Sequence, residues 1–173
     1  MSVVSRITLV LFALTSATLS ACSWQTPVAS PPTAPPQRSP APVVTPTPNE
    51  SARSTAVAVA LAQVGKPYRF GGASPNEGFD CSGLVWFAYR NAGVQTPRTT
   101  RAMWRELVPI GRDELLPGDL LFFNIDGKPE HVGLYIGDDR FVHAPSSGKT
   151  VTVADMSQPY YRRVWLRGAR VTD

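Results

Sequence analysis

The sequence contains few of the residues that would define several common classes of protein. Only two of its 173 residues are cysteine, too few for the disulfide scaffold of a small secreted domain. The net charge is +4, and no basic run or basic–aromatic interleaving is present, so no nucleic-acid partner is expected. The sequence has no internal repeat, and its apolar run of about thirteen residues is shorter than the ~20 that span a bilayer.

Metal-binding signatures are also missing. The sequence has no CxxC or HExxH spacing, which would favour zinc. Cys81, His131 and His143 could still supply three zinc ligands, so a metal site remains an alternative use of these residues. We expect neither a metal nor another cofactor.

Residues 1–21 resemble an export signal. Arg6 gives a positive start, and residues 7–19 form an apolar stretch. This stretch leads into Leu-Ser-Ala-Cys, which resembles a bacterial lipobox ending at Cys22. We expect Cys22 to be lipidated and to hold the protein to a membrane, with an ordinary signal peptide as the alternative. Ser23 favours the outer membrane, and hence a periplasm-facing lipoprotein of the cell envelope.

Residues 22–50 are rich in proline, alanine, threonine and serine and carry almost no charge. They show neither helical nor alternating periodicity, and such a segment cannot bury enough apolar surface to fold. We expect a disordered tether with extended polyproline geometry. A single folded domain is expected over residues 51–173.

Three helices are predicted at the start of this domain. Apolar residues at Val57, Leu61 and Val64 predict a helix over residues 51–64, which Gly65 and Pro67 end. A glycine-rich loop follows. The second helix spans residues 81–91, with Asp80 as its N-cap and with Leu84, Val85 and Ala88 on its inner face. The third runs from Thr99 or Thr100 to Leu107.

The periodicity then changes to two. Short strands are predicted at residues 120–123, 131–136, 140–143, 150–153 and 164–171, with a hairpin turn at Gly137-Asp138-Asp139. Helices followed by strands indicate an α+β fold, with the helices packed on an antiparallel sheet of about five strands.

Cys81 is a candidate nucleophile because it would begin the second helix after a glycine-rich loop. A thiol attacks as the thiolate, and its ordinary pKa of ~8.5 is lowered by the positive end of a helix and by a nearby imidazole. Backbone N–H groups at a helix start also suit an oxyanion. A buried structural cysteine is the alternative.

The two histidines of the chain fall in one predicted hairpin. His131 shares a strand face with Gly133 and Tyr135. A three-residue turn pairs Gly133 with His143, which places the histidine Cβ atoms about 7 Å apart, with Gly133 leaving room for both rings. A two-residue turn would move His143 to the aliphatic face. We predict the first register, with His131 as general base and His143 orienting it; two unrelated surface histidines are the alternative.

Several motifs follow one another in a distinctive order: YRFGG at 68–72, FDCSGLV at 79–85, PRT at 97–99, PGDLLFF at 117–123, HVGLYIG at 131–137 and FVHA at 141–144. Together they resemble the NlpC family of papain-like cell-wall cysteine peptidases over essentially all of residues 51–173. Residues 130–171 further resemble lipoprotein murein endopeptidases of that family.

The resemblance implies a papain-like fold and hydrolysis of peptidoglycan stem peptides. It makes Cys81 the nucleophile, His131 the base and His143 the third polar residue. The implied bond joins D-alanine or γ-D-glutamate to diaminopimelate, and the lipoprotein likeness favours the D-alanyl cross-link. An amidase or acyltransferase on the same scaffold and a non-catalytic wall-binding lipoprotein are the alternatives. We expect a monomer.

The resemblance also implies substrate contacts at Tyr68, Asp80, Ser82 and Arg98. Packing of Tyr68, a helix-cap role for Asp80 and Ser82, and a salt bridge of Arg98 are the alternative roles. Lipoprotein endopeptidases of this kind often carry glutamines where Met103 and Trp104 stand, a departure that bears on the substrate subsites.

Overall fold

The computed structural model describes residues 48–125 and 127–172. The predicted export signal, Cys22 and most of the predicted tether lie outside the described residues. The helices are α1 (Pro48–Leu61), α2 (Cys81–Asn91), α3 (Thr100–Glu106) and α4 (Pro159–Val164), and the strands are β1 (Ala73–Ser74), β2 (Gly78–Phe79), β3 (Val108–Ile110), β4 (Leu120–Ile125), β5 (Lys128–Gly137), β6 (Arg140–His143), β7 (Thr152–Asp155) and β8 (Trp165–Arg170). Over the described residues, no helix is long and apolar enough to cross a membrane.

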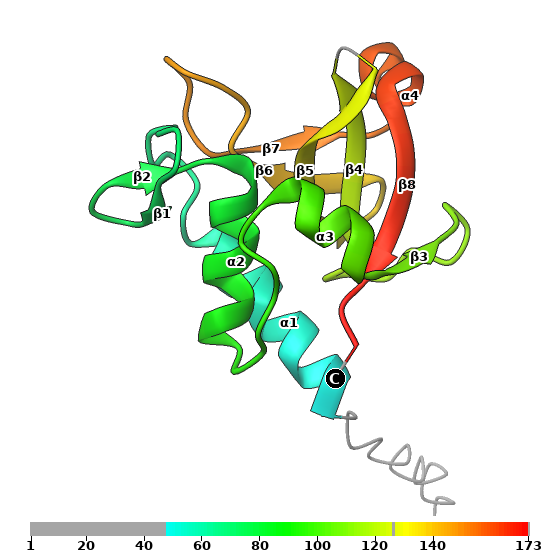
Figure 1. The fold of residues 1–173 in the computed structure, drawn as a ribbon, viewed down its shortest axis with the longest axis horizontal. Helices are drawn as coiled ribbons and strands as arrows, with labels where there is room; N and C mark the ends of the chain where they lie inside the picture. Colours follow the sequence, from blue (N-terminus) through cyan, green and yellow to red (C-terminus); the bar gives the residue numbers. More distant parts are fainter. Residues whose placement is uncertain (1–47, 126, 173) are drawn as a thin grey trace, which may run out of the picture. The chain divides into compact units, whose positions relative to one another are not determined.

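Six of the strands form one antiparallel sheet in the order β3-β8-β4-β5-β6-β7 (Figure 1). Strands β1 and β2 pair separately as a short ribbon before α2. The predicted α+β class and antiparallel sheet are therefore confirmed. The sheet has one strand more than expected, because β3 pairs with β8 at one edge.

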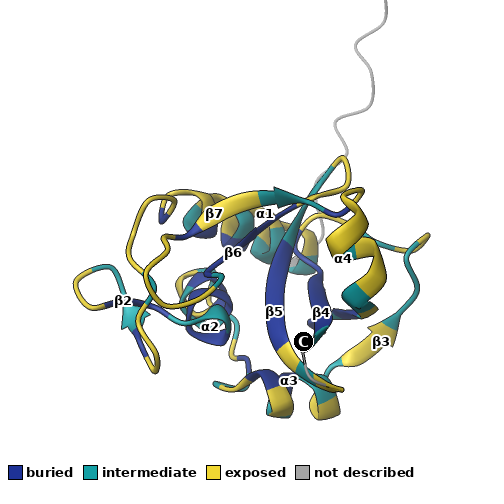
Figure 2. Ribbon diagram, turned by 90° about the horizontal axis from the view of Figure 1, so that it is seen from above, coloured by how far each residue is buried: buried dark blue, intermediate teal, exposed yellow. Residues whose placement is uncertain are grey.

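The two faces of the sheet carry separate apolar clusters because side chains alternate along each strand. Leu120 and Phe122 face the larger cluster, which α1, α2 and α3 complete. Leu121 and Phe123 face a smaller cluster that α4 covers. Figure 2 shows that β4 and the middle of β5 are buried, while α4 and β7 carry exposed surface.

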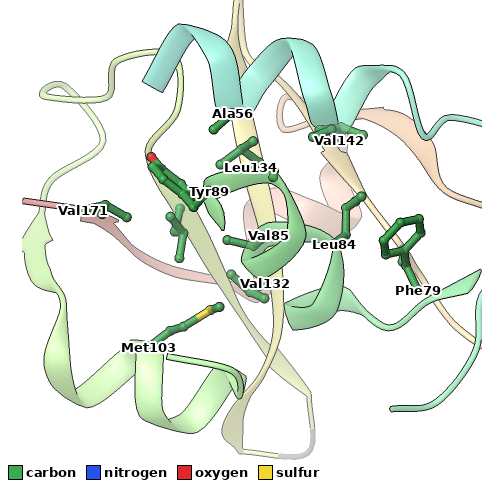
Figure 3. Packing of buried hydrophobic residues seen from close by; sticks show 14 of the residues in the cluster. Ala56, Phe79, Leu84, Val85, Tyr89, Met103, Val132, Leu134, Val142 and Val171 are labelled. Atoms are coloured by element: carbon green, nitrogen blue, oxygen red, sulfur yellow. The ribbon is translucent and has the colours of Figure 1, made fainter. Parts of the chain in front are cut away.

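Helix α2 is the central helix of the larger cluster. Its limits and the N-cap role of Asp80 match the prediction, and Leu84, Val85 and Ala88 are all fully buried. Figure 3 shows Leu84 and Val85 among side chains of β5 and β6, including those of Val132, Leu134 and Val142. This packing against β5 and β6 fixes the position of the first residues of α2, which include Cys81.

The prediction for the first helix is wrong in two respects. Helix α1 begins at Pro48, before the predicted start at residue 51, and ends at Leu61, before the predicted end at residue 64. Its buried face is formed by Ala56 and Ala60, whereas Leu61 and Val64 are exposed and Val57 is only half-buried. Small side chains at these positions allow α1 to pack closely on α2.

The predicted register of the histidine hairpin is confirmed, although its turn differs. Leu134 pairs with Val142 and Tyr135 with Phe141. The same register, extended by one residue, places Gly133 opposite His143. The turn itself has two residues, Asp138 and Asp139, both at positive φ near +50°. A bulge between Tyr135 and Gly137 adds the residue that restores the predicted register.

Candidate active site

Cys81 is the first residue of α2, and Asp80 caps this helix. The carboxylate of Asp80 accepts the backbone N–H of Gly83 at 2.5 Å and that of Gly71 at 2.9 Å. Its extended backbone ends the loop that follows β2 and turns the chain into the helix. The cap therefore fixes both the helix start and the direction in which the Cys81 side chain leaves it.

The sulfur of Cys81 lies against β5 where that strand has no partner in β6. The pairing of β5 with β6 begins at Leu134, so the edge of β5 around residue 131 is not paired with β6. The sulfur lies at this edge. Sγ lies 3.9 Å from the carbonyl oxygen of Glu130 and near the backbone N–H of Val132. These two backbone groups flank His131 on the chain. The sulfur therefore sits beside the backbone of the predicted base.

Burial raises the pKa of the Cys81 thiol above its ordinary value. Hydrogen bonds from Thr100 and from the backbone of Val132 and Ser82 lower it in part, and the charge of Asp80 raises it further. Burial therefore outweighs the lowering that the sequence predicted from the helix start. In the absence of substrate the sulfur is a protonated thiol at neutral pH.

His131 and His143 form a buried, hydrogen-bonded pair. Nε2 of His131 lies 2.7 Å from Nδ1 of His143, and both side chains are almost fully buried. Burial lowers the pKa of His131 to about 4. Burial, with smaller effects of His131 and Lys149, lowers that of His143 to about 3. Both rings are therefore neutral at neutral pH, the state a base needs before it accepts a proton.

The predicted role of Gly133 is corrected by its surroundings. A Cβ at this position would lie 2.5 Å from Cδ2 of Phe141. Gly133 thus makes room for the Phe141 ring and not for the histidines. Phe141 in turn packs on His143, with ring centroids 4.8 Å apart, so the glycine acts on the histidine pair through this ring.

Two clefts open at the site. The first has a volume of about 690 Å³ and is lined by Tyr68, Phe70, Gly71, Asp80, Cys81, Ser82, Arg98, Thr99, Thr100, Arg101, Pro129 and Glu130. The second, of about 410 Å³, is lined by His131 and His143 together with residues of β4, α4 and the loop after β6. Cys81 thus opens into the first cleft, whereas the histidines line the second.

The four predicted substrate residues all lie at the first cleft, but three of them bind one another. Arg98 forms a salt bridge with Asp80 at 3.0 Å and donates to the Ser82 hydroxyl at 3.1 Å. It also donates to the carbonyl oxygen of Gly71. This network holds the loop before Cys81 in place. Tyr68 is half-buried, and burial, aided by the charges of Cys81 and Asp80, raises the pKa of its hydroxyl.

Two charged residues at the first cleft are not engaged in this network. The side chains of Arg101 and Glu130 form no ion pair or hydrogen bond with other residues in the described part of the chain. Both are exposed and line the first cleft. They give the cleft one positive and one negative group that a bound molecule can meet.

Sequence reasoning missed Thr100 and Tyr161 as site residues. Thr100 is almost fully buried, and its Oγ1 lies 3.5 Å from the sulfur of Cys81. The Tyr161 hydroxyl lies 3.5 Å from Nε2 of His143. The sequence marked Thr100 only as a helix start, and nothing in it marked Tyr161, because α4 has no apolar periodicity to place it.

Met103 and Trp104 do not line either cleft. Met103 is fully buried in the larger cluster. Trp104 packs edge-to-face on Phe122, with centroids 5.3 Å apart, and the guanidinium of Arg167 lies over the Trp104 ring, 3.7 Å from its centroid. The departure at these two positions is therefore one of core packing.

Among residues 48–125 and 127–172, no group of three or more histidine, cysteine, aspartate or glutamate side chains is arranged to hold an ion. Nε2 of His131 is hydrogen-bonded to Nδ1 of His143.

The fold and the site together define an α+β protein with a cysteine–histidine centre. Residues 65–170 match the model of the NlpC/P60 family, and the chain belongs to this family.

Two known relatives are named as endopeptidases, one of them as a murein endopeptidase. Murein DD-endopeptidase MepH of Escherichia coli K12 is 40% identical over 127 residues, which are 70% of this chain and 47% of that protein. The probable endopeptidase YafL of the same strain is 38% identical over 63% of this chain and 46% of its own. The present chain spans about half the length of these relatives.

A solved structure supports the same grouping. A lipoprotein-like protein of the NLP/P60 family from Staphylococcus aureus superposes with a TM-score of 0.64 at 34% identity. The match covers 70% of this chain and 42% of that one.

Proposed function

We propose that this protein is a peptidoglycan endopeptidase that hydrolyses the D-alanyl–diaminopimelate cross-link. The observation that carries the proposal is the sulfur of Cys81 beside the backbone of His131, whose ring is tied to His143. The likeness to a murein DD-endopeptidase supports the choice of bond. The bond from γ-D-glutamate to diaminopimelate is the alternative.

In the proposed mechanism Cys81 and His131 begin as neutral groups. Nε2 of His131 is occupied by His143, so Nδ1 takes the thiol proton as the sulfur attacks the carbonyl carbon of the substrate. The backbone N–H groups of Ser82 and Val132 stabilise the negative charge that develops on the sulfur as its proton leaves. The C–S bond forms as the C=O π bond breaks, and this charge passes to the carbonyl oxygen of the substrate. The leaving amine takes the proton from His131, and water then hydrolyses the thioester, returning the proton to the thiol.

The unpaired charges of the first cleft suit this substrate. Diaminopimelate peptides carry both carboxylate and ammonium groups. Arg101 can receive a carboxylate and Glu130 an ammonium group, since neither has to give up a protein partner to do so. The network of Arg98 and Asp80 instead forms a rigid wall of the cleft.

The decisive experiment is digestion of purified sacculi, with mass spectrometry of the released peptides. The natural protein should release fragments with a new carboxyl group on D-alanine and a new amine on diaminopimelate. Cys81→Ala should abolish the release, because it removes the only thiol in the described domain, while thermal denaturation shows an unchanged fold. Release of the same fragments by Cys81→Ala would rule out the proposed nucleophile, and a new carboxyl group on glutamate would assign the other bond.

A further inference from the structure

Tyr161 extends the histidine pair by one more polar group. Its hydroxyl lies 3.5 Å from Nε2 of His143, while Nδ1 of the same ring lies 2.7 Å from Nε2 of His131. The polar atoms of the three side chains therefore form one chain of contacts, from Tyr161 through His143 to His131. Tyr161 comes from α4, the helix that covers the smaller cluster.

Aromatic packing fixes the Tyr161 ring in this position. The ring meets Phe141 edge-on with centroids 5.0 Å apart, and Phe123 likewise at 5.5 Å. Both phenylalanines are buried, so the tyrosine packs on a rigid base. Burial raises the pKa of the Tyr161 hydroxyl, with a smaller contribution from Tyr160, so at neutral pH the group is a neutral hydroxyl. Such a hydroxyl can donate or accept.

The positions of the protons on His131 and His143 decide the direction of each hydrogen bond from Tyr161 to His131. Only Nδ1 of His131 is left to take the thiol proton, because Nε2 faces His143. Once His131 carries protons on both nitrogens, its Nε2–H can only donate to Nδ1 of His143. The single proton of neutral His143 must then be on Nε2, which faces the oxygen of Tyr161.

We propose that Tyr161 is a positioning residue of the catalytic centre: its oxygen accepts the Nε2–H of His143 and holds Nδ1 of that ring toward His131. This inference rests on the proposed function of Cys81 and His131. Removal of the hydroxyl leaves a largely buried N–H without its partner, so other orientations of the His143 ring become populated. The reverse order of protons, with Tyr161 donating, would put a proton on Nδ1 of His131 and block the base.

The kinetic test compares Tyr161→Phe with Tyr160→Phe in the full-length protein. Tyr160 meets Tyr161 edge-on, with centroids 5.1 Å apart, and lines the same cleft, so it is a matched control. Tyr161→Phe should lower kcat roughly fivefold to tenfold with KM unchanged, as expected for one lost hydrogen bond. Tyr160→Phe should leave both constants within about twofold.

A His143→Asn background separates positioning from general destabilisation. The shorter amide does not reach the Tyr161 hydroxyl, so Tyr161→Phe should have no further effect on kcat there. An equal loss in both backgrounds would show a structural role only and overturn the proposal. So would an unchanged or increased kcat for Tyr161→Phe in the natural background, the increase being the mark of the reverse proton order.

Nitrogen NMR of the imidazoles shows which ring nitrogen carries the proton, and it needs no substrate. Both rings should carry their proton on Nε2 in the natural protein, and Tyr161→Phe should shift His143 partly to the Nδ1–H form. A natural protein with the His131 proton on Nδ1 would contradict the inference. Failure to cleave sacculi would instead overturn the proposed function, and the tautomers would still be measured.

Discussion

Burial, more than neighbouring charge, sets the protonation of the reacting groups at the scale of single residues. It raises the pKa of Cys81 and lowers those of His131 and His143. The thiol and the imidazoles are thus both neutral before substrate binds. Charge separation is left to the reaction itself, where the backbone groups around the sulfur can stabilise it.

These shifts predict a specific loss of stability in mild acid. The unfolded chain takes up protons near pH 6.5, whereas folded His131 stays neutral until about pH 4. Folded His143 stays neutral to a still lower pH, about 3. The stability that depends on the two neutral rings should therefore be largely present at pH 7 and be lost as the pH falls to 5, by about 2 kcal/mol for each histidine and about 4 kcal/mol together. Urea denaturation at both pH values measures this fall.

A variant with both histidines replaced, His131→Gln with His143→Asn, is the control for this measurement. Its free energy of unfolding should depend less on pH over the same range, because glutamine and asparagine side chains take up no proton. An equal fall in both proteins would show that other groups are responsible.

The charge of Arg101 on α3 should affect the binding of substrate. Arg101→Ala should raise KM for a stem peptide about tenfold and change kcat little, because a charge-assisted hydrogen bond to a carboxylate is lost. Arg105→Ala is the matched control, since Arg105 is an exposed arginine of the same helix that lies outside both clefts. Similar KM values for the two variants would remove Arg101 from the binding site.

The hairpin of β5 and β6 shows how element geometry controls the site. Gly133→Ala should lower the free energy of unfolding by about 1–3 kcal/mol, because the new methyl group meets the Phe141 ring. Chemical denaturation measures the loss. Gly133→Ala combined with Phe141→Leu should be less destabilised than the sum of the two single variants, and simple additivity would show that this contact is not the cause.

How much of each element could be predicted depends on how local its signals are. The start of α2 was predictable because Asp80 is a helix cap and Leu84 and Val85 mark the inner face. The hairpin register was also predictable, but its two-residue turn and compensating bulge were not, since a bulge depends on contacts across the sheet. Helix α4 was missed because its six residues include Pro159 and two arginines and show no apolar period.

The same reasoning explains the errors about individual site residues. The location of Cys81 at a helix start followed from local sequence, but the direction of its pKa shift did not, because burial comes from distant parts of the chain. Arg98 was identified at the cleft, but its engagement by Asp80 depends on how two loops meet. Tyr161 lies 18 residues from His143 on a helix without a sequence signature.

The attachment predicted for the whole molecule concerns Cys22, outside the described residues. Cys22→Ala should move the mature protein from the membrane to the soluble fraction when cells are fractionated, because no lipid would then be attached. Cys81→Ala is the matched control and should stay with the membrane. Membrane retention of the Cys22→Ala protein would contradict the proposed lipid anchor.

The two halves of the site come from separate layers of the domain, a helix and a sheet whose contacting residues lie 49 positions apart. An unfolded chain thus carries only an ordinary thiol and ordinary imidazoles, with no means of activating each other. Damage or incomplete folding should then abolish hydrolysis and should not broaden the range of bonds that are cleaved. The hydrolysis proposed for this site is therefore restricted to the folded protein.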